Sequence, residues 1–190
     1  MRCLSVLAFA LLPLAGWSDE QCEDIWFTRN LIMDRAGYCF ASPLGQALFD
    51  NSDCVGSQVQ LDAAAAETVT RIRALEAEYA CNVDTRRHGL DMADIAFRRA
   101  LRDLPLRHMG NASEWACQGW TGPTLPLYDG FSDPLHAIGQ ILPGDFVSFG
   151  HDGPGQGWVY VSVHPPGFSG FKSAGWMYWP DRMPCAAEAG

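Results

Sequence analysis

The sequence has little positive charge. Lys172 is the single lysine and there are twelve arginines, against 22 aspartate and glutamate residues, so the formal net charge of the 190-residue chain is −9. Proteins that bind nucleic acids through the phosphate backbone need a basic surface, and we therefore expect no nucleic-acid partner. Hydrophobic residues make up 48% of the chain, which excludes an intrinsically disordered protein and favours a folded chain with a real core.

Long apolar runs are missing as well. After residue 18 no stretch approaches the roughly 18 apolar residues of a transmembrane helix, so we expect no transmembrane segment. Near the start of the chain, the positive charge of Arg2 precedes an apolar stretch over residues 4–15, which is shorter than a transmembrane helix. The small residues Gly16 and Ser18 follow it. This pattern is typical of a signal peptide, here residues 1–18, with cleavage after Ser18 or, alternatively, after Gly16. A core helix is the other interpretation of this segment; the signal peptide predicts a secreted or periplasmic protein.

Cysteines with the spacing of a metal site are absent from the sequence, because no Cys-x-x-Cys occurs, and we expect neither a metal nor another cofactor. Without Cys3 of the signal peptide six cysteines remain. In an exported chain such an even number indicates disulfides and leaves no free thiol. The predicted pairs are Cys22–Cys54, Cys39–Cys81 and Cys117–Cys185.

The pairing of the first four cysteines follows from the predicted helices. A helix over residues 24–36 separates Cys22 from Cys39 by about 20 Å, which is too far for a disulfide. If the next helix doubles back, it returns Cys54 to Cys22, and a third helix then brings Cys81 to Cys39. The two remaining cysteines bracket the second half of the chain, whose ends we expect to lie close together.

The first half of the chain, residues 19–104, has the three- and four-residue apolar spacing of helices. We predict four of them, over about 24–36, 42–50, 62–80 and 92–104. Asp24 is expected to cap the first helix and Gly37 to end it. The fourth helix is expected to turn its apolar residues inward and its arginines outward, with Ile95, Phe97, Leu101 and Leu104 on the inner side and Arg98, Arg99 and Arg102 on the outer side.

Residues 105–114 lose this periodicity and are predicted to link two domains. From 115 to 185, glycine and proline recur every six to ten residues, and the stretches between them alternate like strands, most clearly Phe146–Phe149 and Trp158–Val163. Residues 186–190 are expected to form a tail. The predicted fold class is α+β, with an N-terminal, all-α, disulfide-bonded helical module followed by a small antiparallel β-barrel.

A motif runs through the first predicted helix and beyond it, at Arg29, Asn30, Arg35, Gly37, Tyr38, Phe40, Leu44 and Phe49. Over about 35 residues the chain here resembles the YARHG domain, a small extracytoplasmic module of bacteria, although Ala36 stands at the family's naming histidine. With its cysteines, the chain looks like a secreted bacterial family of unknown function that joins this module to a barrel. We expect the motif to be structural, because its polar side chains can bind carbonyls of the loop after Gly37 and unpaired buried donors are costly.

The second half carries glycine turns in a recurring order, at Leu127–Gly130, Ile138–Gly139, Leu142–Val147, Gly157–Val161 and Gly175–Met177. In this order it resembles a bacterial SH3-like domain, most clearly in the turn Leu142-Pro143-Gly144-Asp145 and the two Gly-Trp pairs. The resemblance implies that residues 115–185 form an SH3-like β-barrel. Members of that family bind cell-wall peptides, bind proteins or merely pack, so the resemblance leaves the ligand open.

Aromatic side chains crowd this second half. Trp158 and Trp176 follow glycines at strand ends and are expected in the core. Tyr128, Tyr178 and Trp179 are expected to be exposed and are the predicted ligand-binding residues, because aromatic side chains supply much of the binding energy in recognition grooves.

A catalytic constellation is missing from the sequence. A Cys–His hydrolase needs a free thiol and a serine hydrolase a Gly-x-Ser-x-Gly turn, and His151-Asp152 is expected to be a turn. We therefore expect not an enzyme but a non-catalytic secreted or periplasmic protein that binds a ligand or associates with the envelope, with peptidoglycan or an envelope protein as partner. The alternatives are a cell-wall hydrolase or other enzyme whose site the motifs do not show, and a stability partner of another protein.

Overall fold

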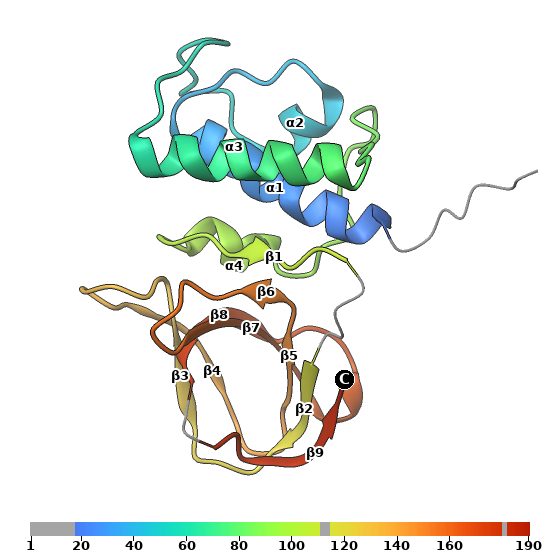
Figure 1. Cartoon of the computed structure of the whole chain (residues 1–190), viewed down its shortest axis with the longest axis vertical. Coiled ribbons are helices and arrows are strands. Elements are labelled where there is room, and N and C mark those ends of the chain that lie inside the picture. Colours follow the sequence, from blue (N-terminus) through green and yellow to red (C-terminus); the bar gives the residue numbers. More distant parts are fainter. Residues whose placement is uncertain (1–17, 111–114, 180–181) are drawn as a thin grey trace, which may run out of the picture.

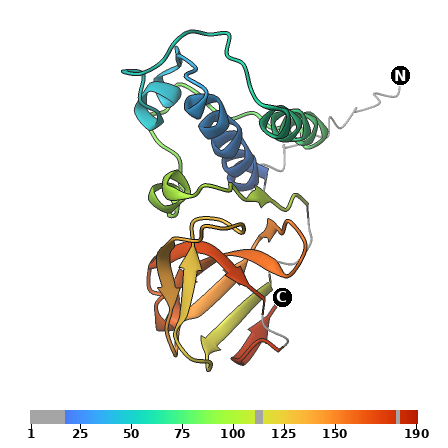
Figure 2. The same ribbon diagram turned by 90° about the vertical axis from the view of Figure 1, so that its left-hand side faces the viewer.

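A computed structural model describes residues 18–110, 115–179 and 182–190 of the chain. Its helices form one layer and its strands a curved sheet beneath them (Figure 1). The view turned by 90° shows the same two layers, with the short strand β1 and helix α4 between the other helices and the sheet (Figure 2). The chain is therefore a mixed helix-and-sheet protein, as predicted, and the predicted signal peptide lies outside the described residues except for Ser18.

The helical layer contains α1 (Ser18–Arg35), α2 (Pro43–Leu48), α3 (Ala63–Glu78) and α4 (Ile95–Ala100). α1 begins before Asp24, so the predicted role of Asp24 as an N-cap is wrong. The helix ends just before Gly37, which has a φ of +85° and is the predicted left-handed stop. α2 and α4 are both shorter than predicted. None of the described helices is long and apolar enough to cross a membrane.

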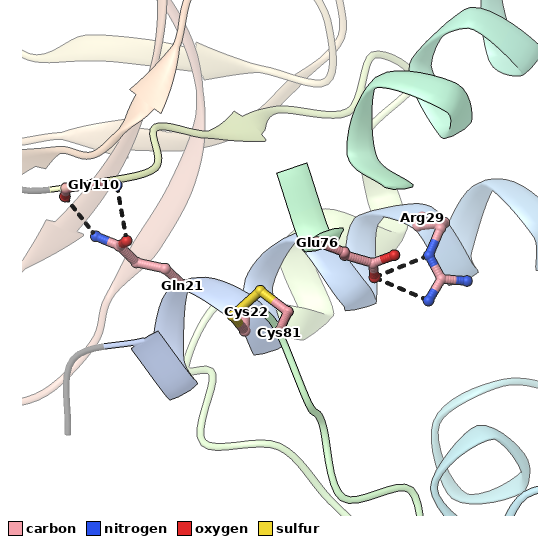
Figure 3. The surroundings of a disulfide bond; sticks show 6 residues. All are labelled: Gln21, Cys22, Arg29, Glu76, Cys81 and Gly110. Atoms are coloured by element: carbon pink, nitrogen blue, oxygen red, sulfur yellow. Dashed lines mark hydrogen bonds and ion pairs between the residues drawn. A yellow bond between two sulfur atoms is a disulfide. The ribbon is translucent and has the colours of Figure 1, made fainter. Parts of the chain in front are cut away.

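α1 lies at the centre of this layer because its neighbours cover it on several sides. Phe27 stacks on Phe49, with ring centroids 5.6 Å apart, in a cluster that includes α2. On the other side, Ile25 packs with Ile72 of α3. The two long helices run antiparallel, since Arg29 bonds Glu76 while the start of α1 meets the chain just after α3 (Figure 3).

The disulfides are Cys22–Cys81, Cys39–Cys54 and Cys117–Cys185, with Cα–Cα distances of 5.4, 5.0 and 5.3 Å. The third pair is confirmed, and the predicted pairs Cys22–Cys54 and Cys39–Cys81 are wrong. We expected the predicted helix over residues 42–50 to return Cys54 to the start of α1, but α2 ends at Leu48. The chain then returns to the end of α1, where the amide of Val55 donates to the carbonyl of Gly37 over 2.7 Å.

The sheet contains β2 (Trp115–Trp120), β3 (Leu125–Tyr128), β4 (Ala137–Ile141), β5 (Phe146–Phe149), β7 (Trp158–His164), β8 (Ser173–Tyr178) and β9 (Cys185–Ala189). All neighbours are antiparallel, in the order β4-β3-β8-β7-β5-β2-β9. The edge strands β4 and β9 are not paired with each other, so the sheet is curved without being closed, which corrects the predicted barrel. β9 includes residues 186–189, which were predicted as a tail.

A second, two-stranded ribbon joins the layers. β1 (Leu106–Arg107), which follows the helices, pairs with β6 (His151–Asp152), which follows β5. His151 and Asp152 are therefore part of a strand and not of the predicted turn. The carbonyl of Gly150 also accepts a hydrogen bond from the amide of His108 over 3.0 Å. Residues from the predicted linker thus pair directly with a segment of the C-terminal half.

The seven-stranded sheet has two different faces. Because successive residues of a strand point to opposite sides, β7 turns Val161 and Val163 to one side and Tyr160 and Ser162 to the other. The first side, which we call the inner face, forms an apolar core with residues such as Leu127, together with the disulfide Cys117–Cys185. The other side, the outer face, lies toward the helices: Tyr160 and Trp176 pack there against Leu101, and Trp176 Nε1 donates to the Asp103 carbonyl over 2.7 Å.

Candidate functional site

Two of the three predicted ligand-binding residues lie near each other. Tyr178, of which 60% is exposed, and Tyr128 flank Trp158 on the outer face, with ring centroids 5.8 and 6.1 Å from the tryptophan. Trp179 lies apart from them, because its ring packs on Phe149, 5.3 Å away, at the inner core. Trp158, predicted to be core, is half-buried at the centre of this group.

Trp176 is 1% exposed, as predicted.

The polar residues of the YARHG motif connect helices. Arg29 donates to Glu76 of α3 through Nε and Nη2, over 3.1 and 3.0 Å (Figure 3). Arg35 donates to the carbonyl of Leu101, at the end of α4, over 2.5 Å. Asn30 donates to the Trp26 carbonyl one turn earlier in α1. The partners are therefore not the carbonyls predicted for them after Gly37.

The remaining motif residues shape the turn after α1. A side chain at Gly37 would combine its positive φ with a contact of 2.9 Å to Val55 Cγ2, which explains the glycine. Phe40 stacks on Phe49 with a centroid distance of 4.6 Å, and Tyr38 packs edge-on against Phe40. These contacts belong to the hydrophobic cluster around α1.

A buried network of charges joins the two layers, and the sequence interpretation missed it. Arg98 of α4 is 1% exposed and not on a solvated face as predicted. Its guanidinium donates to both carboxylate oxygens of Asp24 in α1, and its Nε donates to Asp94 over 2.8 Å. Strand β6 of the two-stranded ribbon supplies His151, whose Nε2 lies 2.6 Å from Arg98 Nη2. Strand β7 of the sheet supplies Tyr160, whose hydroxyl donates to Asp94 over 3.0 Å. We call these five residues the charge network.

Burial and charge together set the protonation of the charge network. Burial alone would raise the pKa of Asp24, but the charge and the hydrogen bonds of Arg98 oppose it and hold that pKa well below its usual range. Burial lowers the pKa of His151 and the Arg98 charge lowers it further, against the opposing effect of Asp24. His151 is therefore neutral near pH 7 and accepts a hydrogen bond from Arg98 at Nε2. Burial and the Asp94 charge raise the pKa of Tyr160. Its hydroxyl therefore stays protonated near pH 7 and is a poor nucleophile.

Beside the charge network lies a cleft of about 830 Å³, lined by both layers. Its floor is a row of small residues in register across four strands, since Ala189 pairs with Ala116, Ala116 with Ser148, and Ser148 with Ser162. Small side chains on neighbouring strands leave a depression in the outer face. Asp24, Asp94, Arg98 and His151 of the charge network line one side of it.

The opposite side of the cleft is aromatic. Phe146 and His164 are paired on β5 and β7, and Phe168 stacks on His164 with ring centroids 4.1 Å apart. Phe168 belongs to the 3₁₀ turn η1 (Pro166–Phe168) and remains 54% exposed. We call Phe146, His164 and Phe168 the aromatic rim. The sequence interpretation did not select these residues, although Gly167-Phe168-Ser169-Gly170 was a visible sign of an aromatic side chain in a glycine-rich turn.

The described residues suit binding better than chemistry. The buried carboxylates and the buried guanidinium of the charge network are bonded to one another, and its histidine and tyrosine each take part in those bonds. Among residues 18–110, 115–179 and 182–190, no group of three or more His, Cys, Asp or Glu residues is placed to hold a metal ion. The exposed side chains in the lining of the cleft include the ring of Phe168 and the carboxylates of Glu20 and Asp91.

This disulfide-bonded protein with a helical layer over an antiparallel sheet combines two known sequence families. Residues 80–190 match the domain of unknown function DUF4453, and since this is more than half of the chain, the chain belongs to that family. Residues 7–77 match the YARHG domain. No curated protein and no solved structure matches the chain. The YARHG domain and the disulfides fit an extracellular or secreted protein.

The two family matches are bonded to each other. The disulfide Cys22–Cys81 joins a cysteine of the YARHG match to one of the DUF4453 match (Figure 3). Next to it, Gln21 exchanges two hydrogen bonds of 3.2 Å with the backbone of Gly110. The charge network crosses the same boundary, between Asp24 and Arg98. The cleft is therefore built by both families together.

Proposed function

We propose that the protein is a non-catalytic ligand-binding protein, exported by a signal peptide over residues 1–18, that associates with the bacterial envelope. Peptidoglycan or an envelope protein is its partner in this proposal, through the SH3-like character of the sheet. The observation that carries the proposal is the cleft between the layers, which has an exposed aromatic ring on one side and fully bonded charges on the other. Exposed aromatic side chains in concave sites are typical of binding surfaces.

The outer face offers two places for a ligand, one at each end. The cleft holds Phe168 at one end, and Tyr128 and Tyr178 lie around Trp158 at the other. The cleft is the better candidate because it is concave and lined by both layers. Neither Tyr128 nor Tyr178 lines the cleft.

Cosedimentation with purified bacterial sacculi, and pull-down from envelope extracts, test this proposal with the oxidised mature chain. We expect retention in at least one of them, and a loss of at least tenfold in retention for Phe168→Ala. The matched control is Val55→Ser, which also removes an exposed apolar side chain but lies outside the cleft. Tyr178→Ala tests the other end of the outer face.

Three results would count against the proposal. Absence of retention in both experiments would remove binding to the envelope. If Tyr178→Ala lowered the retention and Phe168→Ala did not, the binding site would lie around Tyr178 at the other end of the outer face. Release of soluble fragments from the sacculi, lost on changing one acidic residue of the cleft, would indicate a cell-wall hydrolase instead.

A further inference from the structure

The cleft does not end at the aromatic rim. Phe146 and Phe168 line both the cleft and a second cavity of about 360 Å³, whose other walls are Gln118, Gly119, Gly144 and Gly167. Three of these four residues are glycines, so this second cavity has little side-chain volume and an apolar ring at its entrance. A ligand that fills both spaces must pass over the rim and must be elongated.

The backbone holds Phe168 in this position. Phe168 has a φ of +59° and follows Gly167 with a φ of +76°. A phenylalanine in the left-handed region is strained, and strain of this kind is concentrated at functional sites. The ring also keeps more than half of its surface exposed, although it stacks on His164 and meets Phe146 edge-on at 4.9 Å. A bound apolar side chain would cover it.

The other side of the cleft has an excess of negative charge. Its lining contains five carboxylates, those of Glu20, Glu23, Asp24, Asp91 and Asp94, against three guanidiniums, those of Arg87, Arg98 and Arg107. Arg98 is bonded between two of the carboxylates and Arg87 to a third. Asp91 and Glu20 are the exposed carboxylates of this lining. The net charge of the whole chain, −9, has the same sign.

Carboxylates and aromatic faces both attract a cation. A positive group in the cleft would therefore lie between Asp91 on one side and the aromatic rim on the other, while an apolar group next to it would reach the second cavity. An anionic ligand would meet the unfavourable potential of the cleft and of the chain.

We infer that the cleft and the second cavity together bind a peptide in which a basic side chain stands next to an aromatic or aliphatic one. This inference rests on the proposed binding function and gives the class of its ligand. The basic side chain lies toward Asp91 and Glu20, and the apolar one passes over the aromatic rim toward Gly119 and Gly144.

An array of random octapeptides, probed with the oxidised mature chain, tests the inference. We expect the retained peptides to be enriched in Lys or Arg beside Phe, Trp, Leu or Ile. In solution, fluorescence anisotropy of the best dye-labelled peptide should show at least a tenfold weaker affinity for Phe168→Ala. The double variant Asp91→Asn/Glu20→Gln should bind about tenfold more weakly and with a smaller dependence on salt. Val55→Ser should bind like the unchanged chain.

Enrichment of acidic peptides, equal binding of peptides with Lys replaced by Glu, or an array without retained peptides would each overturn the inference. These outcomes are separate from a failure of the proposed function. If sacculi or envelope extracts still retain the chain in a manner that depends on Phe168, the binding function holds and only the ligand class is wrong.

Discussion

The inner face of the sheet is packed with apolar side chains and one disulfide, whereas the outer face meets the helices through aromatic rings and the charge network. The stability that apolar packing provides does not depend on pH, and apolar contacts do not require a fixed orientation of the two side chains. The charge network depends on protonation and on bonds between four elements, α1, α4, β6 and β7. The difference suggests that the inner face makes the sheet stable and the outer face fixes how the helices lie on it, which in turn sets the shape of the cleft.

The largest effect should come from breaking the charge network. Arg98→Met leaves the carboxylates of Asp24 and Asp94 buried without their cation, and we expect the free energy of unfolding to fall by about 3–5 kcal/mol. Urea denaturation at pH 7 measures this loss. The control is Arg71→Met, because Arg71 forms an exposed pair with Asp152, and it should cost less than about 1 kcal/mol. Equal losses in the two variants would show that the network is not the joint between the layers.

A cavity in the inner face should cost nearly as much, but in a different way. Leu127→Ala removes a fully buried side chain, and we expect a loss of about 2–5 kcal/mol in the free energy of unfolding. Since the cluster around Leu127 consists of apolar residues, we expect the same loss at pH 5 and at pH 7. A loss that changed by more than about 1 kcal/mol between these pH values would contradict the separation of the two faces.

The third prediction concerns pH and the outer face. The pKa of His151 is lowered by burial and by Arg98, so the unfolded chain takes up a proton below about pH 6.5 while the folded chain does not. Stability should therefore fall as the pH falls from 7 to 5, by up to about 1.4 kcal/mol per pH unit from this group. The groups that face His151 are Asp24, Arg98, Arg107 and Tyr160.

His151→Gln should remove this contribution to the slope. The carboxylate of Asp24 adds its own loss only at lower pH, because its pKa is lowered from the ordinary value near 3.8. Urea denaturation of both proteins at pH 5, 6 and 7 separates the two groups. Identical slopes for the variant and the unchanged chain would show that His151 is not buried neutral.

A smaller effect is expected at the edge of the network. Tyr160→Phe removes the hydroxyl that donates to Asp94 but keeps the ring between His151 and Trp176. Because Arg98 still holds Asp94, we expect a loss of about 1 kcal/mol in the free energy of unfolding. Thermal denaturation at pH 7 measures it. Tyr178→Ala, at the exposed end of the same face, should change stability by less than about 0.5 kcal/mol.

Much of the fold could be predicted from the sequence because it follows from local patterns. The helical first half, the strands β5 and β7 and the pair Cys117–Cys185 needed only periodicity and counting. The other disulfides could not be predicted correctly, since they depend on where a short helix ends. An error of a few residues in α2 decides whether Cys54 returns to Cys22 or to Cys39.

The candidate site was hidden for a related reason. In the sequence, Asp24 has the appearance of a helix cap and Arg98 that of a solvated arginine, and no neighbouring residue contradicts either interpretation. They lie 74 residues apart in sequence, and only the packing of α4 between α1 and the sheet brings them together. A charge that a distant partner neutralises leaves no local sign in the sequence. Of the predicted ligand-binding residues, Trp179 lies on Phe149 and apart from Tyr128 and Tyr178, because adjacent residues of an extended chain face opposite ways.

The bond between Cys22 and Cys81 has a consequence for the evolution of proteins with this combination of domains. A gene rearrangement that separated the two families near residue 78 would leave one product with an unpaired Cys22 and the other with an unpaired Cys81. It would also separate the carboxylate of Asp24 from the guanidinium of Arg98, which neutralise each other in this chain. Recombination of either domain with other partners would therefore destabilise both products. In this chain the two families are expected to evolve together, each constraining substitutions in the other.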